Sequence, residues 1–245
     1  MAHVKILYFM ENNILQEQIQ YYRDRATEYD EWFFRQGQYD RGEVHRQQWF
    51  AEITEVESAL FAAKPSGDIL ELACGTGLWT KHLATLATNL TAIDAAPEAI
   101  TINQQRVGSV IVHYIIADLF NWEPEQQFDF VFFSFWLSHV PENQFVHFWQ
   151  KVQKSLKPNG RVFFIDGLLN QASTAQNHAL LHQQGHVERK LNDGRTYNIV
   201  KVFYSQQQLQ ESLQKLGWHG QVFSSKNFFL YGLLNLPNAF YKAIY

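Results

Sequence analysis

A glycine-containing turn, followed by an acidic residue after the next apolar run, is the feature of this sequence that most directly suggests chemistry. Residues 68–80 read Asp-Ile-Leu-Glu-Leu-Ala-Cys-Gly-Thr-Gly-Leu-Trp-Thr, so a short strand carrying Glu71 runs into a turn with Gly75 and Gly77. Glycine has no Cβ, which lets a backbone approach a ligand closely. Asp94 ends a second strand-like run, and its carboxylate can accept hydrogen bonds from a ribose diol. The pattern predicts a nucleoside site at the carboxyl edge of a parallel sheet.

Two other nucleotide-binding motifs fit this turn poorly. A dinucleotide fingerprint has a third Gly or Ala three residues after the second Gly, and Thr80 stands in that place. A phosphate-binding P-loop needs Gly-Lys-Ser/Thr, which does not follow the turn. A glycine-rich turn alone is also compatible with a purely structural bend. The interpretation therefore depends on the segments that come later in the chain.

Three later segments follow in a recognisable order. Asp118 comes after the strand-like residues 111–116, residues 128–141 begin as a buried strand and open into a loop, and residues 156–162 read Leu-Lys-Pro-Asn-Gly-Arg-Val. Together with the glycine turn, these segments resemble the class I S-adenosylmethionine (SAM) methyltransferases over about residues 66–168. The resemblance implies an α/β fold, Rossmann-like and doubly wound, with a mostly parallel seven-stranded sheet, an antiparallel last strand and a helical N-terminal cap.

The same resemblance implies that SAM is the cofactor and S-adenosylhomocysteine (SAH) the product. In this family an acid at the position of Asp118 accepts from the adenine amino group, and the next backbone N–H, here that of Leu119, meets a ring nitrogen. Asp118 is equally compatible with a residue that only caps a turn. The sheet-domain positions to which the resemblance assigns cofactor binding are Glu71, Ala73, Gly75, Gly77, Asp94, Ala95, Asp118, Leu119 and Phe135.

The N-terminal residues 21–30 resemble the cap of small-molecule methyltransferases such as the ubiquinone/menaquinone group. By this analogy, Tyr22, Arg25 and Tyr29 cover the methionine end of SAM, with Arg25 near its carboxylate. The alternative is an amphipathic helix that only packs its aromatic side chains on the sheet. We expect a cap over residues 1–64 and a methyltransferase domain over 65–245.

The acceptor is predicted to be a small metabolite, because motifs for larger substrates are missing. Residues 134–137 read Ser-Phe-Trp-Leu, unlike the Asn/Asp-Pro-Pro-Tyr of enzymes that methylate base or glutamine amines. The paired-glutamate loop of arginine methyltransferases is also missing, and the one cysteine, Cys74, lies in the cofactor turn. A net charge of −4 provides no positive field for nucleic acid, so no nucleic-acid partner is expected. The methylated atom, O, N or C, and the oligomeric state stay open.

His139 is the residue that we expect to act as a general base, if the reaction needs one. It lies just past the fourth strand, near where the methyl group should point, and a histidine pKa suits proton removal at neutral pH. The alternative is a histidine that only caps the turn at Pro141. No metal site is predicted, since the histidines lack ligand spacing.

A second polar group surrounds a predicted hairpin whose turn is Asn192-Asp193-Gly194. Strand alternation sends only part of such a group toward one face, and any Arg or Lys that reaches the pocket would favour an anionic substrate. The members of the group are His182, His186, Glu188, Arg189, Lys190, Arg195, Tyr197 and Lys201.

Strand-like and helix-like runs alternate from residue 68 onward, which predicts βαβ units. Helices are expected at 11–35 and 45–63, then at about 77–87, 96–106 and 143–156, and at 206–216. Strands are expected at 68–73, 89–93, 111–116, 129–135 and 160–166, in the hairpin, and as one closing strand at 219–230.

Composition narrows the class of protein further. The chain of 245 residues is 46% hydrophobic and 16% aromatic, enough for a large core and an aromatic pocket. A single cysteine excludes internal disulfides and fits a cytoplasmic setting. No run of residues reaches the length of a membrane span.

Two other functions stay open at this point. A non-catalytic SAM-binding or regulatory subunit would carry the same cofactor motifs, because these motifs report binding rather than turnover. An oxidoreductase with a nucleotide cofactor is less favoured, because of Thr80 and the segment around Asp118.

Overall fold

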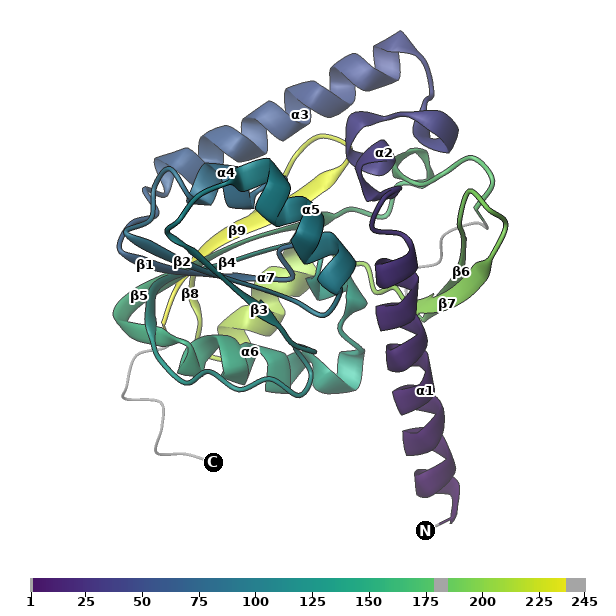
Figure 1. Ribbon diagram of the computed structural model, residues 1–245. Coiled ribbons are helices and arrows are strands. Elements are labelled where there is room, and N and C mark those ends of the chain that lie inside the picture. The colour runs from purple at the N-terminus through teal and green to yellow at the C-terminus, as the bar shows by residue number, and fades with distance from the viewer. Residues whose placement is uncertain (1, 179–184, 237–245) are drawn as a thin grey trace.

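A seven-stranded sheet forms the centre of the protein (Figure 1). This computed structural model describes residues 2–178 and 185–236. The strands are β1 (Asp68–Leu72), β2 (Asn89–Asp94), β3 (Val112–Ile116), β4 (Phe128–Ser134), β5 (Leu156–Gly167), β8 (His219–Ser224) and β9 (Phe229–Asn235). Their order is β3-β2-β1-β4-β5-β9-β8; the first five pair in parallel and β9 runs antiparallel to both neighbours. The expected Rossmann-like fold with an antiparallel last strand is confirmed.

Helices cover both faces of this sheet (Figure 1). On one face lie α3 (Glu43–Ala62), α4 (Thr80–Leu83) and α5 (Pro97–Val107), and on the other lie α6 (Phe145–Lys154) and α7 (Gln206–Lys215). Short 3-10 turns occur at η1 (Gly37–Tyr39), η2 (Leu137–His139), η3 (Glu142–Gln144) and η4 (Gln171–Ser173). The predicted helix at 77–87 is therefore reduced to the four residues of α4.

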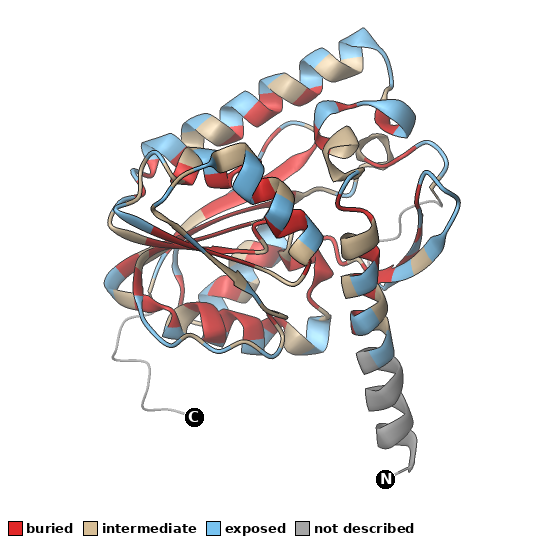
Figure 2. Ribbon diagram, viewed as in Figure 1, coloured by how far each residue is buried: buried red, intermediate tan, exposed pale blue. Residues whose placement is uncertain are grey.

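The central strand β4 shows why the sequence forms a sheet that is buried on both sides. Phe130 and Phe132 pack with Trp49 of α3, whereas Val131 and Phe133 pack with Trp149 of α6 on the opposite face. Successive side chains of a strand point to opposite faces, so a strand covered on both sides is apolar throughout. Burying each such aromatic side chain contributes about 1.5–3 kcal/mol. Figure 2 shows this buried centre in red.

The C-terminal part differs from the expectation in one respect. Residues 219–230 were predicted as a single strand, but β8 and β9 are separate antiparallel strands joined by a turn. The Ser225 hydroxyl and the backbone N–H groups of Asn227 and Phe228 donate to the buried carboxylate of Glu52 on α3, which holds the turn in place. The predicted hairpin is also present, as β6 (His186–Lys190) and β7 (Thr196–Val200), but it forms a sheet of its own.

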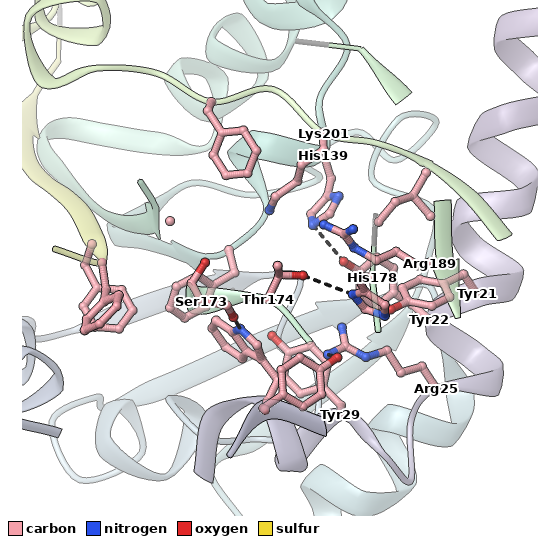
Figure 3. A pocket seen from close by; sticks show the side chains of 18 of the residues that line it. Tyr21, Tyr22, Arg25, Tyr29, His139, Ser173, Thr174, His178, Arg189 and Lys201 are labelled. Atoms are coloured by element: carbon pink, nitrogen blue, oxygen red, sulfur yellow. Dashed lines mark hydrogen bonds between the residues drawn. The ribbon is translucent and has the colours of Figure 1, made fainter. Parts of the chain in front are cut away.

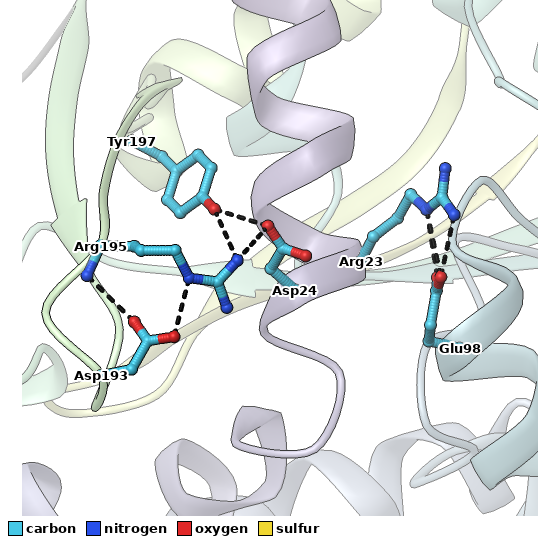
Figure 4. A network of polar contacts seen from close by, with 6 residues as sticks. All are labelled: Arg23, Asp24, Glu98, Asp193, Arg195 and Tyr197. Atoms are coloured by element: carbon cyan, nitrogen blue, oxygen red, sulfur yellow. Dashed lines mark hydrogen bonds and ion pairs between the residues drawn. The ribbon is translucent and has the colours of Figure 1, made fainter.

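The predicted N-terminal helix at 11–35 is in fact two helices. They are α1 (Ala2–Asp24) and α2 (Tyr29–Phe34), separated by a turn at residues 25–28. The end of α1 lies between the hairpin and α5: Arg195 and Tyr197 contact Asp24 on one side, and Arg23 pairs with Glu98 on the other (Figure 4). These pairs are half-exposed, so each contributes only about 0–1 kcal/mol. Within the part of the chain that the structure describes, no helix is long and apolar enough to cross a membrane.

Gly77 should be replaceable by alanine only at a large cost in stability. An added Cβ would lie 2.6 Å from Oδ1 of Asn103, whose side chain bonds Cys74, Gly75 and Thr80. Positive φ costs about 1–2 kcal/mol for alanine, and overpacking adds roughly 1–3 kcal/mol. We expect Gly77→Ala to lower the free energy of unfolding in urea well below that of Gly108→Ala, a control whose Cβ would meet nothing within 4 Å. Equal losses would contradict this packing role.

Candidate functional site

Two adjoining cavities lie at the carboxyl edge of the sheet. The first, which we call the edge cavity, is bordered by the turns after β1, β2, β3 and β4. The second lies under α1, α2 and the hairpin (Figure 3), and we call it the cationic cavity because Arg25, Arg189 and Lys201 line it. Ligands of open α/β sheets bind at this edge. The position of both cavities therefore agrees with the site predicted from the sequence.

The glycine turn after β1 borders the edge cavity. Ala73 and Gly75 both have positive φ, and a Cβ on Gly75 would meet no atom within 4 Å, so the turn faces open space. The Asp94 carboxylate accepts from the backbone N–H of Gly75 at 2.8 Å and of Ala96 at 2.9 Å. Burial raises the pKa of Asp94, while these backbone N–H groups lower it. The carboxylate is thereby fixed at the cavity wall, next to Ala95, with lone pairs left for a diol.

Asp118 and Leu119 form the next part of this wall. Asp118 accepts from the backbone N–H of Phe120 at 2.9 Å and from the Asn121 side chain at 2.7 Å, so it caps its turn and also faces the cavity. Ala96 and Ala99, at the start of α5, and the ring of Trp136 complete an apolar wall. An apolar wall with one acidic edge suits a heteroaromatic base with an amino group.

Helix α2 is tied to the glycine turn by a partly buried polar cluster. The Thr76 hydroxyl donates to Asp30 at 2.6 Å, and Arg106 of α5 pairs with Asp30 and donates to the Thr76 carbonyl at 2.6 Å. The cluster holds α2, and with it Tyr29, over the edge cavity. The sequence analysis did not single out Asp30, Thr76 or Arg106, because their contact depends on how the cap packs on the sheet domain.

Three expected cofactor residues lie elsewhere. Glu71 points into the interior beneath the turn, and burial raises its pKa to about 8. Gly77 packs against Asn103 rather than bordering the edge cavity. Arg25 lines the cationic cavity and not the edge cavity, because the chain leaves α1 just before it. The place of Arg25 beside a methionine carboxylate stays a prediction.

Four side chains line both cavities: Tyr22, Tyr29, Phe135 and His139. Tyr22 and Tyr29 come from the cap, whereas Phe135 and His139 follow β4. Phe135 has φ +54°, a backbone conformation that a bulky residue rarely adopts, and it turns the chain sharply at the end of the strand. We call these four residues the shared wall. It is the place where groups bound in the two cavities could react with each other.

The hydrogen bonds of His139 define its tautomer. Nδ1 lies 2.9 Å from the Val200 carbonyl oxygen, which can only accept, so Nδ1 carries the hydrogen. Nε2 then accepts from the Tyr22 hydroxyl at 2.7 Å. Burial, followed by the nearby positive charge of Lys201, holds the pKa of His139 well below its usual range. His139 is therefore neutral at pH 7, with a basic nitrogen directed at Tyr22.

Two residues of the polar group predicted around the hairpin, Arg189 and Lys201, line the cationic cavity (Figure 3). Burial lowers the pKa of Lys201 to about 8 and also lowers the pKa of Arg189. His186, Glu188, Lys190 and Arg195 are exposed, Tyr197 contacts Asp24 outside the cavity, and His182 lies outside the described residues. The sequence analysis did not assign the other aromatic residues that line the cationic cavity, among them Tyr21, Trp32, Tyr39 and Phe228.

Comparisons with known proteins agree with this geometry. A family model described as a methyltransferase domain matches residues 69–160. A ubiquinone biosynthesis O-methyltransferase from Hydrogenovibrio crunogenus is 33% identical over 101 residues, 39% of this chain and 41% of that protein. A similar enzyme from Xanthomonas campestris is 32% identical over 105 residues, 43% of its length. The match thus spans about two fifths of the length of these curated relatives.

Solved structures extend the likeness to nearly the whole chain. A DhpI–SAH complex is 36% identical, with a TM-score of 0.77, and the match covers 92% of this chain and 98% of that one. A second structure of that protein is described as a DhpI-SAM-HEP complex. The N-methyltransferase NodS of Bradyrhizobium japonicum, 15% identical with a TM-score of 0.57 over 78% of this chain and 88% of that one, shares the fold. The chain belongs to the class I SAM-dependent methyltransferases.

Proposed function

We propose that this protein transfers the methyl group of SAM to an oxygen, nitrogen or carbon atom of a small metabolite held in the cationic cavity. The observation that carries this proposal is the shared wall: two cavities at the carboxyl edge of the sheet meet at Tyr22, Tyr29, Phe135 and His139. In-line transfer needs the nucleophile about 3 Å from the methyl carbon, and positioning of this kind can be worth roughly 7–11 kcal/mol.

The edge cavity fits SAM. Asp94 would hold the ribose diol, and Asp118 with the backbone at Leu119 would hold the adenine edge; Gly75, Ala73 and Ala95 leave room beside them. SAM supplies an electrophilic methyl group on a positively charged sulfur. The rings of Tyr22, Tyr29 and Phe135 offer faces to such a cation, worth about 0.5–2 kcal/mol each. Residues 1–64 would then serve as the cap of the 65–245 domain.

His139 is the proposed base for an acceptor that carries a proton. As the acceptor lone pair bonds to the methyl carbon, the carbon–sulfur bond breaks and its electron pair stays on sulfur. The acceptor proton passes to the Tyr22 oxygen while the Tyr22 proton moves to Nε2 of His139, along the 2.7 Å hydrogen bond. Val200, which accepts from Nδ1, keeps the imidazole in the tautomer that can receive this proton.

A labelled-methyl experiment separates this enzyme from a non-catalytic SAM-binding protein. The protein is incubated with methyl-labelled SAM and the small-molecule fraction of a cell extract. We expect the label to appear in a low-molecular-weight product. Label that is only retained by the protein would favour a binding or regulatory subunit.

The composition bears on the setting and the partner of the protein. A single cysteine supports a cytoplasmic setting, and a charge of −4 supports a small-molecule partner rather than nucleic acid.

Asp94→Ala should weaken SAH binding at least tenfold. Loss of a hydrogen bond to a charged group costs about 1.5–3 kcal/mol, which corresponds to about tenfold to a hundredfold in affinity. Calorimetric titration measures the change, and Asp129→Ala is the control, because Asp129 lies at the other end of the sheet, paired with Lys157. Unchanged affinity in a folded Asp94 variant would refute the assignment of Asp94 to the ribose.

His139→Asn should lower turnover at least tenfold, a larger change than its effect on SAH affinity, because general-base catalysis is worth about 10²–10⁴ and Gln18 still ties the cap to the backbone of residue 139 and to Val200. The control is His186→Asn, on the exposed face of the hairpin. Because its pKa is depressed, His139 becomes protonated only well below its usual range, so the wild-type rate should fall only at acidic pH. A variant with normal turnover would show that no base acts at this position.

A further inference from the structure

Three cationic side chains from different parts of the chain line the cationic cavity (Figure 3). Arg25 follows α1, Arg189 lies in β6 and Lys201 follows β7. Arg25 and Arg189 are only 8% and 7% exposed. None of the three forms an ion pair within residues 2–178 and 185–236. Positive charge is therefore buried without a direct counter-ion.

The hydrogen-bond partners of these cations are neutral groups. Arg25 donates to the Tyr39 hydroxyl at 3.1 Å, Arg189 to the Glu188 backbone carbonyl at 3.3 Å, and Lys201 to the Ser138 hydroxyl at 2.7 Å. A guanidinium has five N–H donors, so most donors of the two arginines are uncommitted among the described residues.

Arg35 shows what a purely structural buried arginine looks like in this chain. It is 1% exposed, stacks on Trp49 and donates to the backbone carbonyls of Trp32, Ala172 and Ser173. It is absent from the lining of the cationic cavity. Arg25 also lies over aromatic rings, but Arg25 and Arg189 each make a single side-chain hydrogen bond among the described residues, so most of their donors are left for something other than the fold.

The carboxylate of Asp166, which acts on Lys201, does not balance the three cations. Asp166 raises the pKa of Lys201, but its two oxygens already accept from the backbone N–H groups of Ser138 and Gly167, at 2.8 and 2.7 Å. Arg189 and Arg25 both lower the pKa of Lys201, as expected for uncompensated like charges. The segment 179–184, whose sequence is Ala-Leu-Leu-His-Gln-Gln, contains no acidic residue.

Burying unpaired charge is costly, so such a cluster is stable only when a partner offsets it. We propose that Arg25, Arg189 and Lys201 bind a compact oxyanion, a phosphoryl-type or carboxylate group, on the methyl acceptor. This inference rests on the proposed function and names its substrate class. A bound anion would also raise the pKa of the nearby His139 toward the range useful for a base, because it offsets the positive charge of Lys201 and Arg189.

Simple anions test the cluster without knowledge of the acceptor. Sulfate and acetate are titrated calorimetrically into the SAH-loaded protein, with potassium chloride at matched ionic strength as the reference. We expect one of them to bind more tightly than chloride. Preference for sulfate assigns a tetrahedral phosphoryl-type group, and preference for acetate assigns a carboxylate. The acceptor found by labelling should then carry that group.

Two substitutions test whether the three cations hold the anion. Arg189→Gln and Lys201→Met should each lower the affinity for the preferred anion about tenfold or more, the loss expected for a charge-assisted hydrogen bond. Arg195→Gln is the matched control, because Arg195 lies on the same hairpin but is exposed and paired with Asp24 and Asp193 (Figure 4). Thermal unfolding and SAH affinity verify that each variant is folded.

The pH dependence provides a second measurement on the same samples. Lys201 loses its proton as pH rises through about 8, whereas sulfate and acetate do not titrate there. Wild-type affinity should therefore fall across that pH, and the affinity of Lys201→Met should stay level. The charged groups that act on Lys201, namely Asp166, Arg189 and Arg25, are common to both proteins, so the difference between the two curves reports Lys201.

Two results would overturn the inference: anions that bind no better than chloride, or binding that is equally strong in the Arg189 and Lys201 variants. In either case, intact SAH affinity would leave the methyltransferase function standing. If the wild-type protein failed to bind SAH, the proposed function itself would be wrong, independently of the anion result.

Discussion

The contact between Tyr22 and His139 is the interaction on which the rest of the site depends. It joins a helix of the cap to the turn after β4, and the two side chains stand between the edge cavity and the cationic cavity. Gln18, on the same helix, strengthens this junction, since it donates to the His139 carbonyl and accepts from the Val200 N–H. One rigid junction thus fixes the cap, the base and the boundary between two ligands. Methyl transfer needs this kind of positioning more than it needs any single reactive group.

The two cavities differ in electrostatic character, which assigns them different ligands. Carboxylates at strand ends, Asp94 and Asp118, border the edge cavity, and they suit the hydroxyl and amino groups of a nucleoside. Buried cations border the other cavity and suit an anion. The aromatic rings of the shared wall separate the acids from the cations and present apolar faces where the sulfonium loses its charge.

The sheet and most of the edge cavity could be predicted from the sequence, and the cationic cavity could not. Alternating strand and helix patterns place strand ends at one edge, so the positions of Gly75, Asp94 and Asp118 follow from local pattern alone. Helical spacing, however, is continuous through Arg25 and gave no sign of the break between α1 and α2. The hairpin was predicted, but strand alternation puts Arg189 and Arg195 on the same face of it, and only the packing against α1 decides that Arg189 lines the cavity while Arg195 pairs with Asp24. These placements depend on tertiary contacts, which periodicity does not report.

A crystal structure with SAH bound tests the central claim most directly. We expect the ribose hydroxyls on Asp94, the adenine between Asp118 and Trp136, and the sulfur at the shared wall, facing Tyr22 and the cationic cavity. A sulfur atom directed away from that wall, or a nucleoside bound outside the edge cavity, would contradict it.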